Sequence, residues 1–230
     1  MAELRILSSN TAQGVMAALV PRFERASGHK VTLSYDSARL IMERIRNGET
    51  ADAVILAGPV MDKALATGTI VRTSLTGIAR CGIGVAVRAG APHPEIGTVE
   101  AFKRALFDAQ TVAYTETGVS GIYFAGLIER LGIAQEIKAK ARTRPGGLIA
   151  ELVASGEAEL AVQQIPELIP VKGIDIVGPL PTELQNITVV SAGVFANARQ
   201  PAAAAAFLKF LTTPETADVY RAKGFEFGAA

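Results

Sequence analysis

The sequence predicts an α/β protein with two lobes. Short apolar segments alternate with amphipathic helical segments, which is the order of strands and helices in a parallel sheet. The alternation occurs twice, and two long apolar segments at 81–90 and 186–195 join the repeats. We therefore expect two α/β lobes connected by two crossover strands. The predicted lobes are listed by residue: 1–78 with 193–230 form lobe 1, and 79–192 form lobe 2.

The first repeat begins with "LRIL" at 4–7. Val15, Leu19 and Phe23 then recur at helical spacing and predict a helix over 14–27. The alternating segment "KVTLSY" predicts a second strand, and the apolar segment "ADAVILAG" predicts a buried third strand. The remaining elements expected here are a strand at 30–35, a helix at 39–48, a strand at 51–58 and a helix at 61–67.

The second repeat follows the long strand 81–90. After a helix, a short strand is predicted, and the loop "TETGVSG" at 115–121 that follows this strand corresponds to "SSNTAQG" in the first repeat. The chain closes with two helices within 201–225, broken at Pro214. The other expected elements are helices at 98–109, 122–133 and 146–158, and strands at 111–114, 160–168 and 186–195.

Composition excludes several classes of protein. The 23 basic and 22 acidic residues are spread evenly and no Trp occurs, so we expect no nucleic-acid partner. No apolar run reaches the length of a membrane span, so no membrane insertion is expected. Cys81 is the single cysteine, and His29 and His93 are far apart in the chain, which leaves no set of ligands for a structural metal site.

Known catalytic signatures are also missing. The segment "GIGVAVRAG" lies inside a strand and lacks the glycine spacing of a dinucleotide site, and no Walker-type phosphate loop occurs. "GVSG" is not the elbow of a serine hydrolase. We expect no cofactor and no metal.

Small polar residues follow the predicted strand ends. Each such row can simply cap a helix, and it can also hold a small anion through hydroxyls and helix N-terminal amides. Because strand ends of α/β lobes line a ligand cleft, their common placement favours the anion site. Gly118 and Gly121 would allow the backbone to approach a ligand closely. The candidate ligand-binding hydroxyls and amides are Ser9, Asn10, Thr11, Ser37, Thr115 and Ser120.

Three longer polar side chains complete the candidate set. Arg39 follows the second strand, and Arg80 enters the first long strand. Either guanidinium can be a solvated charge or the partner of a carboxylate ligand. Gln163 lies at a strand end next to Gln164, where one of the two should face the cleft.

The chain resembles the molybdate-binding-like branch of the type II periplasmic solute-binding proteins. The resemblance spans nearly the whole chain and rests on the opening strand and loop, "GVSGIYFAGLIERLG", "LVASGEAELAVQQ" and "FLTTPETADVYRAKGF". It implies the two-lobed type II fold and a small anionic ligand. It also implies an ABC transporter membrane component as a partner.

The sequence departs from the molybdate pattern at the loops. Relative to that family, Arg39 is added after Ser37, "LAGP" replaces a polar triplet, and Gln163 replaces a tyrosine. These departures favour an organic acid over a tetrahedral oxyanion. "ARCGIGVAVRAGAP" and "AKGFEFG" resemble the organic-acid subgroup of this branch, which includes aconitate isomerase.

Two functions therefore stay open. The first is a solute-binding protein that holds an organic acid in the cleft and presents it to a transporter. The second is an enzyme that isomerises a tricarboxylic acid, with Glu116 or Tyr114 as base and Arg39 or Arg80 as clamp. A ligand-sensing domain of a regulator is a third hypothesis, with less support. The expected location is periplasmic if a leader has been removed, and cytoplasmic if the chain is native as written.

Overall fold

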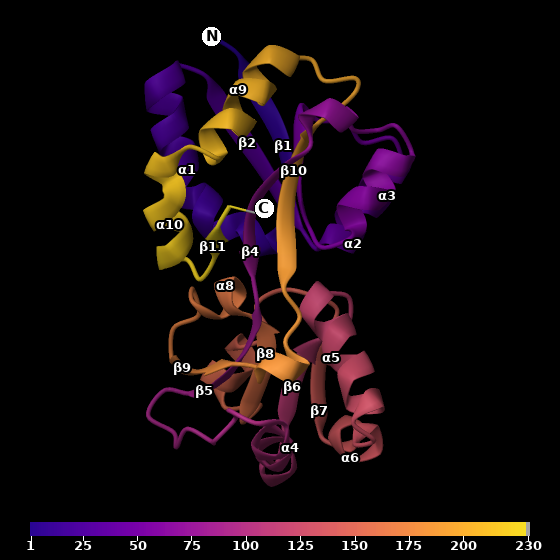
Figure 1. Cartoon of the computed structure of the whole chain (residues 1–230), viewed down its shortest axis with the longest axis vertical. Coiled ribbons are helices and arrows are strands. Elements are labelled where there is room, and N and C mark those ends of the chain that lie inside the picture. Colours follow the sequence, from indigo (N-terminus) through magenta and orange to yellow (C-terminus); the bar gives the residue numbers. More distant parts are fainter. Residues whose placement is uncertain (229–230) are drawn as a thin grey trace. The chain divides into compact units, whose positions relative to one another are not determined.

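The computed structural model describes residues 1–228 and divides them into two compact units (Figure 1). Unit 1 contains Met1–Cys81 and the chain from Thr188 onward, and unit 2 contains Gly82–Ile187. The predicted boundaries, 78/79 and 192/193, lie a few residues away. The chain changes unit at Cys81 and Thr188 because the two strands that carry these residues pair with each other within unit 1.

Unit 1 is built on a six-stranded sheet of order β11-β4-β10-β3-β1-β2. β1, β2 and β3 run parallel, and β10 runs antiparallel to both β3 and β4. All five residues of β3 are buried, as expected for a strand covered on both faces. The strands are β1 Glu3–Ser9, β2 Lys30–Asp36, β3 Ala53–Ala57, β4 Thr76–Cys81, β10 Thr188–Val194 and β11 Glu226–Phe227.

Helices cover both faces of this sheet. α1, α9 and α10 lie on one face, and α2 and α3 lie on the other (Figure 1). The α2–α3 side packs on Leu7, Val54 and Leu56 of the central strands. The helices are α1 Gln13–Ser27, α2 Ala38–Arg46, α3 Val60–Ala66, α9 Pro201–Leu211 and α10 Ala217–Ala222.

Unit 2 is built on a five-stranded sheet of order β7-β6-β8-β5-β9. β6, β7 and β8 are parallel, and β5 is antiparallel to β8 and β9. The sequence patterns did not predict the edge strands β7 and β9, whose residues are only partly buried and carry charges. The strands are β5 Ile83–Arg88, β6 Val112–Thr115, β7 Ala141–Arg144, β8 Leu160–Gln164 and β9 Ile174–Pro179.

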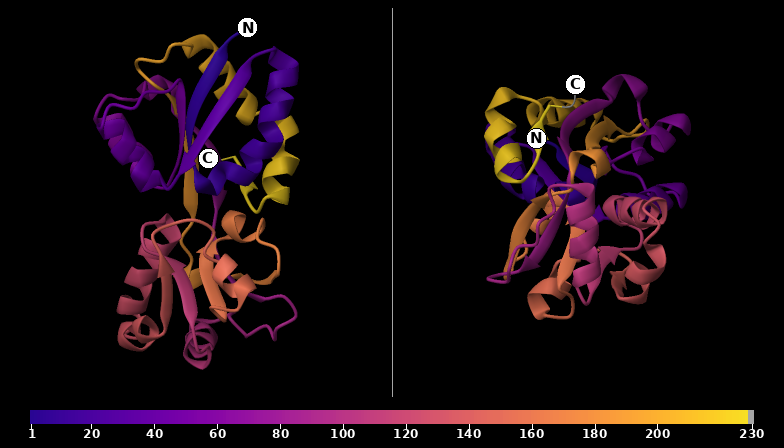
Figure 2. Two further views of the ribbon diagram at one scale, coloured as in Figure 1. Left: turned by 180° about the vertical axis from the view of Figure 1, so that it is seen from behind. Right: turned by 60° about the horizontal axis from the view of Figure 1, so that its bottom comes forward.

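Each face of the second sheet has its own core. Phe102, Phe124 and Ile137 of the larger helices pack on one face, and the small residues Ala113 and Ala161 face a second core on the other. Figure 2 shows the helices on both sides of each sheet from two further directions. The helices are α4 Val99–Asp108, α5 Val119–Arg130, α6 Ala134–Ala139, α7 Glu151–Ser155 and α8 Ile165–Leu168. No helix within residues 1–228 has the length and apolar character that crossing a membrane demands.

The two sheets share one internal order. β2-β1-β3 and β7-β6-β8 are parallel triplets, and each is followed by an antiparallel strand. β1 and β6 are therefore equivalent central strands, and each leads into a long helix, α1 or α5. The repeat predicted from "SSNTAQG" and "TETGVSG" is confirmed at the level of topology.

Several predicted elements have different limits. The expected strand 81–90 is shorter and forms β5, and β4, which ends at Cys81 and belongs to the other sheet, was not predicted. The helix expected at 122–133 begins at Val119, so Ser120 lies in its first turn and not in a loop. The expected helix 146–158 is reduced to α7, and 160–168 is β8 followed by α8.

Asp52 fastens three parts of unit 1 together. Its side chain is buried, and its carboxylate accepts hydrogen bonds from the backbone amides of Arg5 at 2.8 Å and Gln200 at 2.8 Å. Gln200 is the residue that precedes α9. A buried carboxylate with two amide donors is stable because both the charge and the donors are satisfied.

Replacing Asp52 by alanine should destabilise the protein strongly. Asp52→Ala leaves two partly buried hydrogen bonds without their acceptor, and we expect a loss of about 3 kcal/mol. Urea unfolding followed by circular dichroism measures this. The matched control is Asp62→Ala, which removes an exposed aspartate of α3 and should change stability by less than about 1 kcal/mol. Equal stability of the two variants would contradict the role given to Asp52.

Candidate functional site

The carboxyl ends of β1 and β2 bring the unit 1 candidates together. β1 and β2 are in parallel register, with Ser9 opposite Asp36, so Ser37 follows at the level where Asn10 and Thr11 leave the sheet. Ser9, Thr11 and Ser37 are buried, and Asn10 is half-buried. The four predicted residues therefore occupy one edge of one sheet.

Ser9 has a buried hydroxyl that no group satisfies. Its side chain is 1% exposed, and its Oγ has no hydrogen-bond partner within residues 1–228. Ser9 stands directly before the short 3-10 turn Asn10–Ala12 that opens α1, but it does not cap that turn. α1 also begins without a side-chain cap. The start of α1 thus combines an unpaired hydroxyl with uncapped amides, which is the donor pattern of an anion site.

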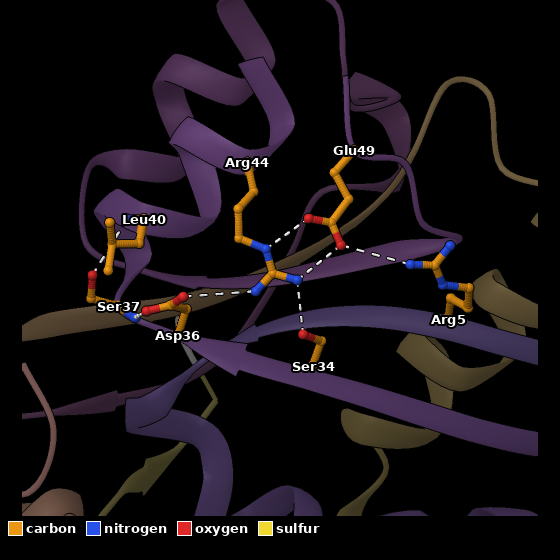
Figure 3. Close-up of polar contacts among 7 residues, drawn as sticks. All are labelled: Arg5, Ser34, Asp36, Ser37, Leu40, Arg44 and Glu49. Carbon is orange, nitrogen blue, oxygen red and sulfur yellow. Dashed lines mark hydrogen bonds and ion pairs between the residues drawn. The ribbon is translucent and has the colours of Figure 1, made fainter. Parts of the chain in front are cut away.

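The loop after β2 is held by the polar network of Figure 3. The Arg44 guanidinium donates to Glu49 through two nitrogens, at 2.7 and 2.8 Å, and to the Ser34 hydroxyl at 2.8 Å. It also lies 3.8 Å from the Asp36 carboxylate. Asp36 in turn accepts from the Ser37 amide, and the Ser37 hydroxyl caps α2 by accepting from the Leu40 amide.

Electrostatics keeps this network charged. The hydrogen bonds from Arg44 hold the pKa of Glu49 below its ordinary value, and Glu49 raises the pKa of Arg44. A bidentate arginine–carboxylate pair has one preferred geometry. The network therefore fixes where Ser37 and the start of α2 lie.

Thr115 is the counterpart of Ser9 in unit 2. It ends β6, its side chain is 2% exposed, and its Oγ1 has no hydrogen-bond partner within the described chain. The helix that follows, α5, starts at the glycine N-cap Gly118 without a side-chain cap. Ser120 is buried in its first turn. Both equivalent central strands thus end in a buried, unpaired hydroxyl before an uncapped helix.

Two glycines let α5 approach that hydroxyl. A Cβ on Gly118 would overlap the Oγ1 of Thr115, and a Cβ on Gly121 would overlap the Thr115 carbonyl oxygen. The predicted close approach of the backbone at these glycines is what the structure shows. Thr117 completes the turn by donating its hydroxyl to the carbonyl of Pro145.

Gln163 is buried and fully engaged within unit 2. Its Nε2 donates to the Gly147 carbonyl at 2.8 Å and to the Glu167 carboxylate at 2.5 Å, and its Oε1 accepts from the Ile149 amide at 2.9 Å. It belongs to β8, which is parallel to β6. These contacts suit a residue that positions the 147–149 loop, and they leave its amide hydrogens no place for a ligand.

The two candidate arginines differ in their surroundings. Arg39 is exposed in the first turn of α2, and its guanidinium forms no ion pair or hydrogen bond with residues 1–228. Arg80 donates through Nε to Glu226 of β11 at 2.6 Å. β10 and β3 separate its strand from β1, a lateral distance of about 14 Å at the usual strand spacing. These features favour Arg39 as the guanidinium for a ligand and count against Arg80.

The two candidate bases also differ. Tyr114 is buried in the unit 2 core with its ring against Phe124, and burial raises its pKa. A phenol that holds its proton in a core is a poor general base. Glu116 is exposed, and its carboxylate accepts from the Thr143 hydroxyl at 2.8 Å. Of the two, only Glu116 is accessible to a ligand.

Sequence reasoning missed the residues that fix these loops. Arg44 and Glu49 face each other across the end of α2, and Glu167 of α8 accepts a hydrogen bond from Gln163 of β8. The second pair joins a strand to the helix that follows it, so helical spacing does not predict it. The first depends on the turn at Gly48, which returns the chain toward the helix.

Comparison with known proteins assigns the chain to a family. The profile of the bacterial extracellular solute-binding proteins matches residues 4–226, so the chain belongs to that family. A curated relative, the aconitate isomerase of a Pseudomonas species, is 34% identical over 97% of this chain and 87% of its own length.

Solved structures agree on the fold. The periplasmic molybdate-binding protein of Azotobacter vinelandii is similar with a TM-score of 0.81 at 19% identity, covering 98% of this chain and 100% of its own. The sulfate-binding protein SubI of Mycobacterium tuberculosis is similar with a TM-score of 0.79 at 16% identity, covering 98% and 86% of the two chains. The predicted two-lobed periplasmic-binding-protein fold and the resemblance to the molybdate-binding-like branch are confirmed.

The approach of α5 to Thr115 gives a steric prediction. Gly121→Ala should destabilise the protein by about 3 kcal/mol, because the new methyl group overlaps a backbone carbonyl that cannot move aside. Gly126→Ala in the same helix is the control, since its Cβ would meet the Arg130 guanidinium at an ordinary 3.6 Å. It should stabilise by about 0.5–1 kcal/mol. Thermal unfolding of both variants checks the pair, and a stable Gly121→Ala protein would refute the close approach.

Proposed function

We propose that the protein binds a small organic anion at strand-end sites, which are built alike in the two units. The observation that carries the proposal is the pair of buried, unpaired hydroxyls, Ser9 and Thr115, at equivalent strand ends before uncapped helices. A buried hydroxyl without a partner is unfavourable, and an anion that accepts from it removes that penalty. Membership of the solute-binding family supports the same conclusion.

Within this proposal the ligand contacts in each unit come from the starts of its helices. Asn10 and Thr11 lie at the start of α1, Ser37 at the start of α2 and Ser120 at the start of α5. Hydroxyls and helix N-terminal amides suit carboxylate oxygens, and Arg39 supplies a positive charge. The family description supports a place outside the cytoplasmic membrane, with an ABC transporter membrane component as the partner that receives the ligand.

Removal of either hydroxyl should raise the stability of the empty protein and lower its affinity for the ligand. Ser9→Ala and Thr115→Val each delete a buried, unpaired hydroxyl, so the empty protein should become more stable by about 1 kcal/mol. The affinity for trans-aconitate, citrate or molybdate, whichever binds, should fall about 5- to 10-fold because one hydrogen bond is lost. Thermal shift and isothermal titration calorimetry measure the two effects.

The matched control for this test is Tyr220→Phe. The Tyr220 hydroxyl is also buried without a hydrogen-bond partner in the described chain, but it belongs to α10, and its ring packs against Phe225 and Phe227. This variant should gain stability and keep the affinity of the parent protein. Unchanged affinity in both Ser9→Ala and Thr115→Val would refute the proposed site.

The isomerase relative supports a second candidate function. In an allylic isomerisation a base takes a proton from the methylene carbon of aconitate, and the electron pair moves the double bond by one carbon. A proton then returns to the former vinylic carbon, so no atom is gained or lost. Glu116 is the candidate base because its carboxylate is exposed and directly follows Thr115.

One measurement distinguishes the isomerase function from the carrier function. Proton NMR of cis-aconitate incubated with the protein in deuterium oxide should show the trans isomer and exchange of carbon-bound hydrogen if the chain is an isomerase. Glu116→Gln should then reduce turnover at least about 100-fold while binding stays within a few-fold. Bound aconitate that does not turn over would leave the carrier function, and full turnover by Glu116→Gln would exclude Glu116 as the base.

A further inference from the structure

Lys223 lies against the start of α1. It follows α10 directly, and its Cδ is 3.7 Å from the position that a Cβ on Gly14 would occupy. Gly14 is the second residue of α1, so the lysine side chain crosses the first turn of that helix. The ammonium group is two bonds beyond Cδ and can therefore reach this turn.

No acidic side chain neutralises this lysine. Lys223 is half-buried, and its ammonium makes no ion pair or hydrogen bond with residues 1–228. The acids of the same chain segment are engaged elsewhere: Asp218 pairs with Arg221 and Glu226 pairs with Arg80. The first turn of α1 contains no acidic residue.

The placement is electrostatically unfavourable in the empty protein. A helix N-terminus carries partial positive charge, so a cation beside it is repelled unless an anion stands between them. Arg39 lies in the first turn of α2, which also has no acid, although the Ser37 hydroxyl and the Asp36 carboxylate accept from amides at this helix start. Two unpaired cations therefore accompany two helix N-termini in unit 1, and the buried Ser9 hydroxyl lacks a partner at the same sheet edge.

We propose that Lys223 is a ligand-binding residue of the unit 1 site and that, with Arg39, it selects an organic anion with two or more carboxylates. This inference rests on the proposed function and adds its charge requirement. A single carboxylate or a neutral solute would leave at least one cation uncompensated. A polycarboxylate can give each cation its own partner, with the Ser9 hydroxyl donating to a carboxylate oxygen.

Calorimetric titration of the full chain with trans-aconitate, succinate, acetate and molybdate tests the inference. Lys223→Met keeps most of the aliphatic side chain and removes the charge. We expect it to weaken trans-aconitate binding about 10- to 100-fold, the loss expected for a charge-assisted hydrogen bond. Lys223→Arg should recover most of the affinity. Raising the salt concentration should weaken binding more in the parent protein than in Lys223→Met.

Lys209→Met is the matched control, because it makes the same charge change at an exposed lysine of α9. It should bind trans-aconitate like the parent protein, and thermal unfolding should show that all variants are folded. Equal affinity of Lys223→Met and the parent protein would overturn the role of Lys223. Preference of the parent protein for molybdate or acetate over trans-aconitate would overturn the selection of polycarboxylates. Absence of binding of all four anions by the parent protein would instead overturn the proposed function itself.

Discussion

The buried hydroxyls of Ser9 and Thr115 are the constraint around which each unit is arranged. In the empty protein both lack a partner, although nearly all buried polar groups in proteins have one. Each unit accepts this penalty at the end of its central strand, where the sheet order places the start of a long helix. An anion that accepted from these hydroxyls would remove the penalty, which is the physical basis of the proposed site.

The surroundings of the two hydroxyls are held by different means. In unit 1 the Arg44–Glu49 pair fixes the neighbouring loop through charge, and Asp52 ties β1 to the start of α9. In unit 2 the approach of α5 depends on glycines, and Gln163 holds the loop near β8 through three hydrogen bonds. Charged networks and close backbone packing both resist local motion, so the donors stay in place without a ligand.

In the proposed site, positive charge determines which class of anion is preferred. Hydroxyls and helix amides accept any small oxyanion, and they do not by themselves distinguish molybdate from a carboxylic acid. Arg39 and Lys223 add two positive charges that no acid of the described chain compensates. Arg80 does not contribute in this way, because Glu226 already neutralises it. A carrier and an isomerase of a polycarboxylate would share this requirement, and they differ only in whether a base reaches the carbon-bound proton.

The sequence by itself determined the α/β class, the repeat and the polar strand ends, because the spacing of apolar residues and the loops of small residues are local properties of the chain. It also pointed to Ser9, Thr115 and the glycines after them. Only the tertiary structure decided which charges are paired. Arg80 meets Glu226 across 146 residues, and Lys223 reaches Gly14 from the other end of the chain. Strand order creates such contacts, and no local pattern encodes it, so neither the Arg80–Glu226 pair nor the place of Lys223 beside α1 could be predicted from the sequence.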